Sequence, residues 1–359
     1  MMNKKVGYGM ALALALAAPF FLYPVFLMKV MCFALFACAF NLLIGFTGLL
    51  SFGHAAFFGG AGYITGYMLK SAGVPTELGL LLGTGVAALI GLFMGSLAIR
   101  RQGIYFTMIT LALSQMLYFV FLQAPFAGGE DGLQGVPRGK LLGLIDLAND
   151  LTLYYLVLAI AVAGLALIVR TIHSPFGQVL KAIKENEPRA ISLGYDVDKY
   201  KLLAFVLSAA LSGLAGSTKT LVLGFETLTD VHWSLSGLVV LMTLVGGLGT
   251  IAGPVVGAII IIALENKLGD LGSWLAAMTS IEWFRSIGES VTIVTGFIFI
   301  VCVLAFRRGI VGEIVARFKR PAKSYANLTQ HFEPRPAQTA NARSGPVHVA
   351  PDHSGVDNC

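Results

Sequence analysis

Apolar residues fill long segments of this chain, and polar residues gather in the short stretches between them. An α-helix needs about 20 mostly apolar residues to cross a bilayer, and we predict about ten such segments. They run roughly over 7–28, 30–50, 53–69, 77–98, 104–123, 151–169, 201–223, 234–249, 251–265 and 287–306. The third, eighth and ninth segments are short for a span. One or two of them could be re-entrant or broken, so we expect roughly eight to ten transmembrane crossings in total. The pattern predicts an all-α polytopic integral membrane protein.

The first segment follows Lys4 and Lys5 and has the start of a secretory signal peptide. However, apolar residues continue to Leu27 without the polar region at which such a peptide is cleaved. We therefore expect this segment to be retained as a span.

Composition supports the membrane prediction. The chain is 56% hydrophobic and 12% charged, whereas a soluble domain has about 25% charged residues. Cytoplasmic loops of membrane proteins carry an excess of Lys and Arg. With a cytoplasmic N-terminus, most of the 25 Lys and Arg fall in cytoplasmic segments, including Arg100, Arg101 and Arg170. We therefore predict that both termini face the cytoplasm, and we attribute the net charge of +6 to these loops rather than to nucleic acid binding.

One strongly charged segment, residues 174–201, separates the sixth and seventh apolar segments. Its apolar residues recur at helical spacing, which predicts two short amphipathic helices. Pro188 suits the first turn of the second helix, Asn186 or Glu187 suits its N-cap, and Gly194 suits its end. Helices this short are marginal alone and need a surface to pack on. We predict that another protein supplies this surface; the alternative is a solvated loop.

We expect the chain to have two parts. A transmembrane domain covers 1–306, with the charged loop 174–201 on its cytoplasmic side, and a basic tail covers 307–359. From Pro321 onward the tail is rich in proline and polar residues and has no hydrophobic periodicity. Such a composition cannot bury enough apolar surface to fold, so we predict that the tail is disordered.

The sequence carries no catalytic motif. It has no phosphate loop of the form G-x-x-x-x-G-K-[ST], no His pair at ligand spacing on a helix, and no metal-ligand spacing among its four cysteines. Its carboxylates lie in loops, tails or near the ends of apolar segments, which weakens the case for a proton-coupled carrier. We therefore expect no catalytic residue, no metal and no cofactor. A solute path without its own energy source needs a partner that supplies one.

Polar and small residues interrupt the second and third apolar segments between Asn41 and Gly66. Candidates for lining a translocation path, here and in the fifth segment, are Asn41, Thr47, Ser51, His54, Thr107, Ser114 and Gln115. The alternative is structural: the glycines are helix contacts, His54 caps a helix end, and the hydroxyls bond back to their own helix.

A second interrupted run covers 245–258 and places Gly249, Gly253 and Gly257 four residues apart. Pro254 disfavours a continuous helix there. Broken helices at matching places in the two halves of a transporter often flank a binding site. The pairing of this run with the interrupted run at 41–66 suggests an internal repeat.

Four runs of sequence carry a resemblance to a known family. They are NLLIGFTGLLSFGHAAFFGGAGY at 41–63, GGEDGLQGVP at 128–137, GQVLKAIKENEPRAISLGYDVDKYKLLAFVLSAALSGLAG at 177–216 and GGLGTIAGPVVGA at 246–258. The similarity extends from about Lys29 to Phe306. In these runs the chain resembles the permease subunits of bacterial branched-chain amino acid ABC importers, more closely the LivM type than the LivH type.

The resemblance implies several partners in the bacterial inner membrane and periplasm: a second permease of the LivH type, two ATP-binding subunits and a periplasmic amino-acid-binding protein. It also implies that 174–201 is the loop that couples the permease to the ATPase. The general importer motif is Glu-Ala-Ala, three residues and Gly; here Pro188, Arg189 and Ala190 stand at its start, so only Ala190 and Gly194 match. The residues assigned to coupling are Lys184, Glu185, Glu187, Arg189, Ala190 and Gly194.

The resemblance thus implies a permease that forms, with the second permease, the path for leucine, isoleucine or valine. ATP hydrolysis would occur on the partner subunits, so the chain itself is not an enzyme. Two alternatives stay open. The nearest is an importer of urea or short-chain amides built on a similar permease, although GGEDGLQGVP looks more like the amino acid branch. The other, from a different class, is an ion-coupled carrier that works alone.

Overall fold

The computed structural model describes residues 4–101, 103–141, 143, 145–279, 296–297, 300 and 309–313. The chain divides into two units, Met1–Phe318 and Lys319–Cys359, and every element described below belongs to the first. Most of the predicted tenth segment, 287–306, and of the predicted tail, 307–359, lies outside the described residues.

The described elements are mostly helices. In chain order they are α1 (Lys4–Ala17), the 3-10 helix η1 (Ala18–Phe20), α2 (Pro24–Thr47), α3 (His54–Lys70), α4 (Thr76–Ala98), α5 (Ile104–Gln123), η2 (Pro125–Ala127), η3 (Gly129–Asp131), β1 (Leu133–Gln134), β2 (Lys140–Leu141), β3 (Ile145–Asp146), α6 (Asp150–His173), α7 (Pro175–Glu185), α8 (Glu187–Ser192), α9 (Val197–Leu223), β4 (Phe225–Glu226), η4 (Leu228–Asp230), α10 (Trp233–Gly246) and α11 (Gly253–Thr279).

Five of these helices are long and apolar enough to cross a bilayer: α2, α4, α5, α6 and α9. This confirms the predicted class, a polytopic α-helical membrane protein, because helices satisfy their backbone hydrogen bonds internally in lipid. The helices α3 and α10 have 17 and 14 residues and are short for a span, as the third and eighth apolar segments predicted. The total of about ten crossings and the orientation stay predictions.

Three predicted boundaries are wrong. The first two apolar segments were expected to meet near Lys29, but α1 ends at Ala17 and α2 begins at Pro24. Pro24 suits a helix start because the first turn does not need its N–H. Lys29 lies inside α2, where its Nζ is 5.9 Å from the centre of the Phe33 ring. The ninth segment, expected to end at residue 265, continues as α11 to Thr279, since a helix can outlast its apolar stretch.

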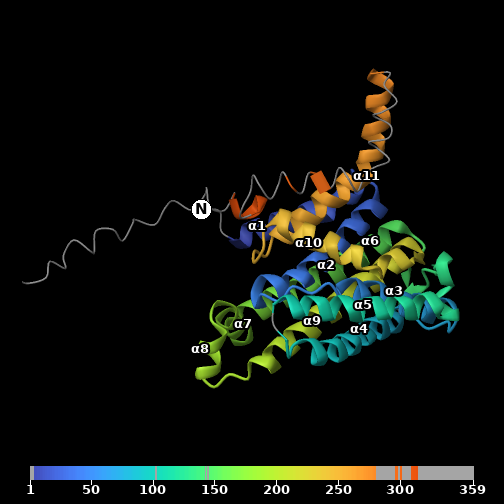
Figure 1. Cartoon of the computed structure of the whole chain (residues 1–359). Helices are drawn as coiled ribbons and strands as arrows, with labels where there is room; N and C mark the ends of the chain where they lie inside the picture. Colours follow the sequence, from blue (N-terminus) through green and yellow to red (C-terminus); the bar gives the residue numbers. More distant parts are fainter. Residues whose placement is uncertain are drawn as a thin grey trace, which may run out of the picture. The chain divides into compact units, whose positions relative to one another are not determined.

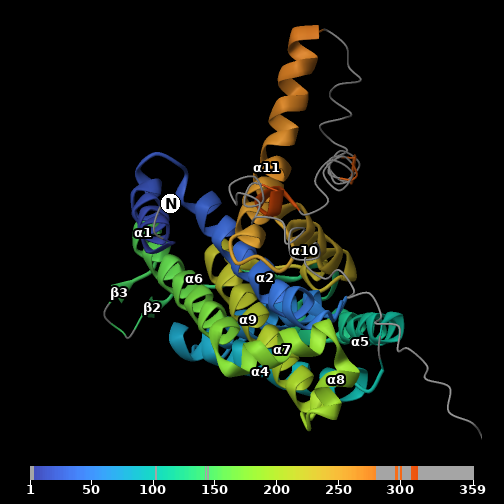
Figure 2. The same cartoon turned by 90° about the vertical axis from the view of Figure 1, so that its left-hand side faces the viewer.

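The helices α2 and α9 lie at the centre of the bundle (Figure 1). α2 contacts α6, α9, α10 and α11, and α9 also contacts α3 and α4 (Figure 2). Glycines bring these helices close: a Cβ at Gly216 would overlap the Phe58 carbonyl, and a Cβ at Gly213 would overlap Ala87. Small residues permit such contacts in lipid, where van der Waals packing rather than the hydrophobic effect holds helices together.

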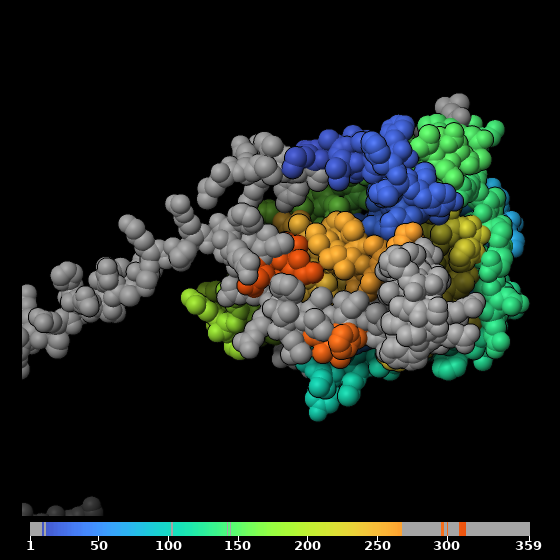
Figure 3. All heavy atoms as spheres, turned by 90° about the horizontal axis from the view of Figure 1, so that it is seen from above, coloured from blue at the N-terminus to red at the C-terminus, as the bar shows by residue number. Residues whose placement is uncertain are grey.

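The outer helices have the opposite character. α4 and α5 expose large apolar side chains, among them Leu81, Leu89 and Phe119, as expected of surfaces that face lipid. On another face, the blue N-terminal residues lie beside the green residues of α6, and orange residues of α11 lie next to them (Figure 3).

The two ends of α9 have different surroundings. At its N-terminal end lie α7 and α8 (Figure 2). At its C-terminal end, β1 pairs with β4, with Leu133 opposite Glu226, and β2 pairs with β3. Arg138 fixes the β1–β2 connection there, because it binds Asp150 at 2.6 Å and the Val222 carbonyl at 3.0 Å. A helix of this length, 27 residues, separates the two ends by about 40 Å.

Candidate functional site

The segment 174–201 folds into the two predicted short helices. Ser174 caps α7 by accepting a hydrogen bond from the Gly177 N–H at 3.3 Å, and Asn186 caps α8 by accepting one from the Arg189 N–H at 3.1 Å. Asn186, rather than Glu187, is therefore the N-cap of α8. Gly194 follows α8 with φ +86°, a backbone conformation that favours glycine, and so ends this helix as predicted.

These helices are anchored to the molecule. The side chains of Ile183, Ala190 and Val197 are buried together in a small apolar cluster beneath the loop. Lys201, only 4% exposed, binds Glu187 with an Nζ–Oε1 distance of 2.6 Å. The segment is therefore a structured element rather than a slack linker. Asp196, within this segment, is the N-cap of α9, and a hydrogen bond from Lys199 lowers the pKa of its carboxyl.

The anchored loop presents apolar side chains to its surroundings. Leu193 is 68% exposed and Ile191 is 57% exposed, and Tyr195 beside them is also exposed. Large apolar side chains surrounded by charge are typical of a surface that a partner covers. Of the predicted coupling residues, Lys184, Glu185, Arg189 and Gly194 are exposed, Glu187 is half-buried and Ala190 is buried.

The loop 174–201 contacts the C-terminal turn of α2. The Lys184 ammonium donates a hydrogen bond to the Gly45 carbonyl at 2.7 Å, and the Lys181 ammonium lies 5.8 Å from the centre of the Phe46 ring. The last carbonyls of a helix have no partner within the helix and form the negative end of its dipole. A lysine from α7 satisfies one of them here.

The first predicted interruption is a helix break between α2 and α3. Gly48 has φ +79° and ends α2, and α3 starts at His54. The break is held from α5: the Thr107 hydroxyl donates to the Leu50 carbonyl at 2.9 Å, and the Thr110 hydroxyl accepts from the Phe52 N–H at 3.3 Å.

Two more predicted path residues make local bonds at the same break. The Thr47 hydroxyl donates to the Leu43 carbonyl at 2.6 Å, one turn back in α2, and the Ser51 hydroxyl accepts from the Gly53 N–H at 3.1 Å. The structure thus brings Thr47, Ser51 and Thr107 together around one break.

The second predicted interruption is a break between α10 and α11. α10 ends at Gly246 and α11 begins at Gly253, as the glycines and Pro254 predicted. Asn41 of α2 holds this break with its side-chain amide: Nδ2 donates to the Thr250 carbonyl at 2.8 Å, and Oδ1 accepts from the Gly249 N–H at 3.0 Å. The two breaks are therefore connected through α2.

His54 lies in an aromatic environment. Its ring is fully buried and makes edge contacts with Phe40, Phe57 and Phe205. Its Nε2 is 2.9 Å from the Ser208 hydroxyl, which itself donates to the Ala39 carbonyl at 2.6 Å. Because a serine has one proton to donate, the His54 Nε2–H must donate to Ser208. His54 thus links α3 to α9.

The remaining path candidates lie on α5. Ser114 is buried and its hydroxyl has no hydrogen-bond partner among the described residues, while Gln115 is half-buried. A cavity of about 480 Å³ lies elsewhere, lined by residues that include Val74, Thr76 and Lys140, and none of the seven path candidates lines it. Their part in a translocation path stays a prediction.

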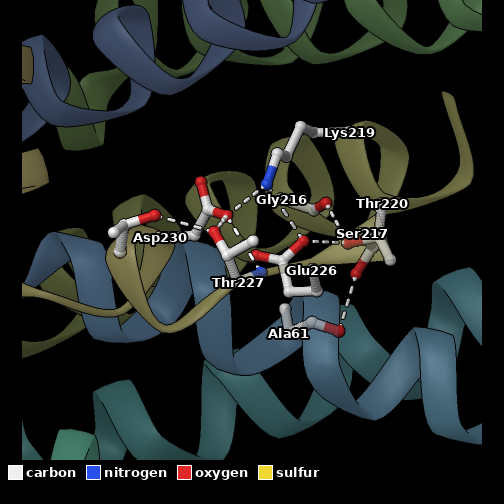
Figure 4. Close-up of polar contacts among 9 residues, drawn as sticks. Ala61, Gly216, Ser217, Lys219, Thr220, Glu226, Thr227 and Asp230 are labelled. Atoms are coloured by element: carbon white, nitrogen blue, oxygen red, sulfur yellow. Dashed lines mark hydrogen bonds and ion pairs between the residues drawn. The ribbon is translucent and has the colours of Figure 1, made fainter. Parts of the chain in front are cut away.

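A buried ionic cluster at the C-terminal end of α9 was missed by the sequence interpretation (Figure 4). The Lys219 ammonium, 4% exposed, lies 2.5 Å from Asp230 Oδ2 and 3.2 Å from Glu226 Oε2. The Thr220 hydroxyl donates to Glu226 Oε2 at 2.5 Å, and the Thr227 hydroxyl donates to Asp230 Oδ2 at 2.6 Å. Glycine at position 62 of α3 leaves room for the cluster, because a Cβ there would meet Glu226 and Thr220.

The cluster has one ammonium for two carboxylates. Burial raises the pKa of the Glu226 carboxyl to about 8, since that side chain is fully enclosed and Lys219 lies nearer to Asp230. The available signal was a lysine inside a predicted span, followed by acidic residues seven and eleven positions later. A buried lysine requires such a partner, so the pairing could have been anticipated.

A family model described as branched-chain amino acid transport system / permease component matches residues 24–310. Relatives include the high-affinity branched-chain amino acid transport system permease protein LivM of Salmonella typhimurium, 25% identical over 261 residues that cover 66% of this chain and 61% of LivM. The matched region thus spans less than two thirds of LivM.

Relatives with other names also occur. The ribose import permease protein RbsC of Haemophilus influenzae is 27% identical over 229 residues, covering 59% of this chain and 68% of RbsC. The autoinducer 2 import system permease protein LsrC of Klebsiella pneumoniae is 29% identical over 191 residues, covering 51% of this chain and 53% of LsrC. Because the family model matches most of its length, the chain belongs to the family of branched-chain amino acid transport system permease components.

Proposed function

We propose that this chain is a permease subunit of an ATP-driven importer for branched-chain amino acids in the bacterial inner membrane. The observation that carries the proposal is the family match over 24–310, within which the anchored loop 174–201 exposes Ile191 and Leu193. Membership of this family implies partners that bind ATP and partners that bind the solute. ATP hydrolysis would then occur on the partner subunits, and the chain would supply no catalytic residue.

In this proposal the loop is a lever. ATP-driven closure of the partner subunits moves α7 and α8, which then shift the helices between outward-open and inward-open arrangements. The exposed apolar residues enter a groove on the ATPase, and the surrounding charges, including Lys184 and Arg189, set the register of docking. Both termini and the loop face the cytoplasm, residues 1–306 form the permease domain, and 307–359 form a tail.

The substrate proposal rests on the relatives. LivM is named for branched-chain amino acid transport, and RbsC and LsrC are named for ribose and autoinducer 2, so a polar sugar-like solute is the second candidate. We favour leucine, isoleucine or valine because the family model carries that description. The path would include Asn41, Thr47, Ser51, His54, Thr107, Ser114 and Gln115, together with a second permease of the LivH type.

Uptake by the reconstituted complex tests this substrate proposal. Proteoliposomes with the complex, ATP inside and the cognate binding protein outside should accumulate labelled leucine, and unlabelled valine should compete whereas ribose and urea should not. Competition by ribose or urea instead would overturn the amino acid proposal. Proteoliposomes with this chain alone should show no uptake; ion-driven uptake by the chain alone would favour the stand-alone carrier.

Co-purification tests the docking proposal. Leu193→Asp places a charge on the exposed apolar surface and should reduce the co-purified ATP-binding subunit, while the chain still inserts and folds. Ile145→Asp is the matched control, because Ile145 is an exposed apolar residue at the other end of α9. Equal recovery of the ATPase with both variants would contradict the docking proposal.

A further inference from the structure

The C-terminal turn of α2 contacts two structures that are far apart in the sequence. At Gly45 it receives a hydrogen bond from Lys184 of the loop 174–201, and one turn earlier Asn41 binds the α10–α11 break. Asn41 and Gly45 are four residues apart, so they lie on one face of α2, one above the other. This turn is a physical connection between the loop and the break.

Lys184 makes the contact between the loop and α2. Its ammonium donates to the carbonyl of Gly45 at 2.7 Å, and its Cγ lies where it would touch a Cβ at Gly48, at 3.4 Å. Gly45 belongs to the last turn of α2, where backbone carbonyls lack helical partners. A movement of α7 therefore acts directly on the backbone of α2.

Asn41 makes the contact between α2 and the α10–α11 break. Its amide makes two hydrogen bonds to consecutive residues of the break, Gly249 and Thr250, and the side chain is only 3% exposed. Because the Asn41 amide is itself buried, breaking this pairing would leave its polar atoms without partners. Gly45 makes the approach possible, because a Cβ there would lie 2.9 Å from the Gly249 nitrogen.

We propose that Asn41 is a positioning residue for transport: it transmits movement of the coupling loop, received at Gly45, to the break between α10 and α11. The inference rests on the proposed function, because it assumes that 174–201 docks on an ATPase. It adds a specific route, from Lys184 through Gly45 and Asn41 to Gly249. The break lies at the start of α11, so its position sets the direction of that helix.

The test uses the complete complex, purified with its ATPase and reconstituted into proteoliposomes. Three variants interrupt the route at different points: Lys184→Met keeps the aliphatic stem, Asn41→Leu removes both amide bonds, and Gly45→Ala forces Asn41 and Gly249 apart. The matched controls are Lys199→Met, an exposed lysine of the same segment that pairs with Asp196, and Gly237→Ala, a helical glycine with no atom near its Cβ position. Solute uptake and ATP hydrolysis are measured together, with the thermal midpoint of each complex.

We expect each of the three variants to retain the ATPase subunits and to transport about tenfold less solute per ATP hydrolysed. The two controls should match the wild type. Because the contacts act in series, the double variant Lys184→Met with Asn41→Leu should transport as much solute per ATP as the more impaired of the two single variants.

Unchanged uptake per ATP in assembled Asn41→Leu and Lys184→Met complexes would overturn the inference. A parallel fall of uptake and hydrolysis that follows loss of folded complex would also overturn it, because that result marks a purely structural role. Failure of the wild-type chain to co-purify with any ATPase is a separate result, which would contradict the proposed function itself.

Discussion

Both ends of α9 carry ion pairs, and one pair at the N-terminal end, unlike those at the C-terminal end, is exposed to water. At the N-terminal end, Asp196 and Lys199 form an ion pair at 2.8 Å in which the lysine side chain is 79% exposed. At the C-terminal end, Lys219 is paired with Glu226 and Asp230 and almost fully buried. An exposed pair can separate at little cost because water replaces each partner. A buried pair cannot, because each separated charge would lack both partner and solvent.

This difference suggests which end of the bundle moves. The end with the loop 174–201 is held by the hydrogen bond from Lys184 to Gly45, by the single ion pair between Lys201 and Glu187, and by a small apolar cluster. The opposite end is held by buried charges and by the β1–β4 pairing. We expect the coupling-loop end to shift during a transport cycle while the buried cluster stays assembled.

Removing the buried ammonium should have the largest effect. Lys219→Met leaves Glu226 and Asp230 buried without their cation and should destabilise the protein by about 3–5 kcal/mol. The measurement is the thermal midpoint in detergent. Lys199→Met is the matched control on the same helix and should leave the midpoint unchanged, because its pair is exposed. Equal decreases of the thermal midpoint in the two variants would contradict the difference between the two ends of α9.

The pH dependence of stability should report the buried carboxyl. Burial raises the pKa of Glu226 from an ordinary value of 4.5 to about 8, so in this range the folded state holds a proton that the unfolded state releases. Stability contributed by Glu226 should therefore fall as pH rises through this window, by at most about 1.4 kcal/mol per pH unit. Glu226→Gln should reduce this pH dependence of stability, as measured by thermal midpoints between about pH 4.5 and 8. A slope identical to the wild type would contradict this assignment.

Filling the space beside the cluster should have an intermediate effect. A Cβ at Gly62 would lie within 2.7 Å of Glu226 Oε2 and 2.5 Å of the Thr220 hydroxyl, so Gly62→Ala should cost about 1–3 kcal/mol through overpacking. Gly85→Ala provides the control, because no atom lies within 4 Å of its Cβ position in α4. The thermal midpoints of the two variants are compared. An unchanged midpoint in Gly62→Ala would show that the cluster can rearrange to admit a methyl group.

The smallest stability effect is expected at the coupling loop. Gly194 has φ +86° with open space around it, so Gly194→Ala should cost about 1 kcal/mol of backbone strain without a clash. Gly73→Ala, with φ +62° and equally open surroundings, should cost the same. Only Gly194→Ala should also lower the ATPase activity of the purified complex. Equal ATPase activity in both variants would weaken the lever proposal.

The sequence predicted the two short helices α7 and α8 well, since their structure is decided locally. Asn186 and Gly194 cap and end α8 through bonds to residues within a few positions. Proline and glycine likewise predicted the break at 247–252. The start of α2 was missed because an isolated Lys29 looks like a boundary in sequence, although the long lysine side chain can lie against a ring inside a helix.

The partners of the polar residues could not be predicted, because they are distant in sequence. Asn41 binds residues near 250, His54 binds Ser208, and Thr107 binds Leu50. Residue type gave their polarity, but only the packing of α2 against α9, α10 and α11 determines what each one contacts. Lys219 differs from these residues, because its partners Glu226 and Asp230 follow within eleven positions and a lysine inside an apolar segment was a usable signal.

Cross-linking can show whether the loop 174–201 docks on an ATPase. Cysteine is introduced either by Leu193→Cys or by Ile145→Cys, in a background with Cys302 and Cys359 changed to serine; Cys32 and Cys38 are buried. A short thiol-to-amine cross-linker is then added to the native membrane. We expect a cross-link from position 193 to an ATP-binding subunit and no cross-link from position 145 to that subunit. A cross-link from 145 alone, or none from 193 in an assembled complex, would contradict the docking proposal.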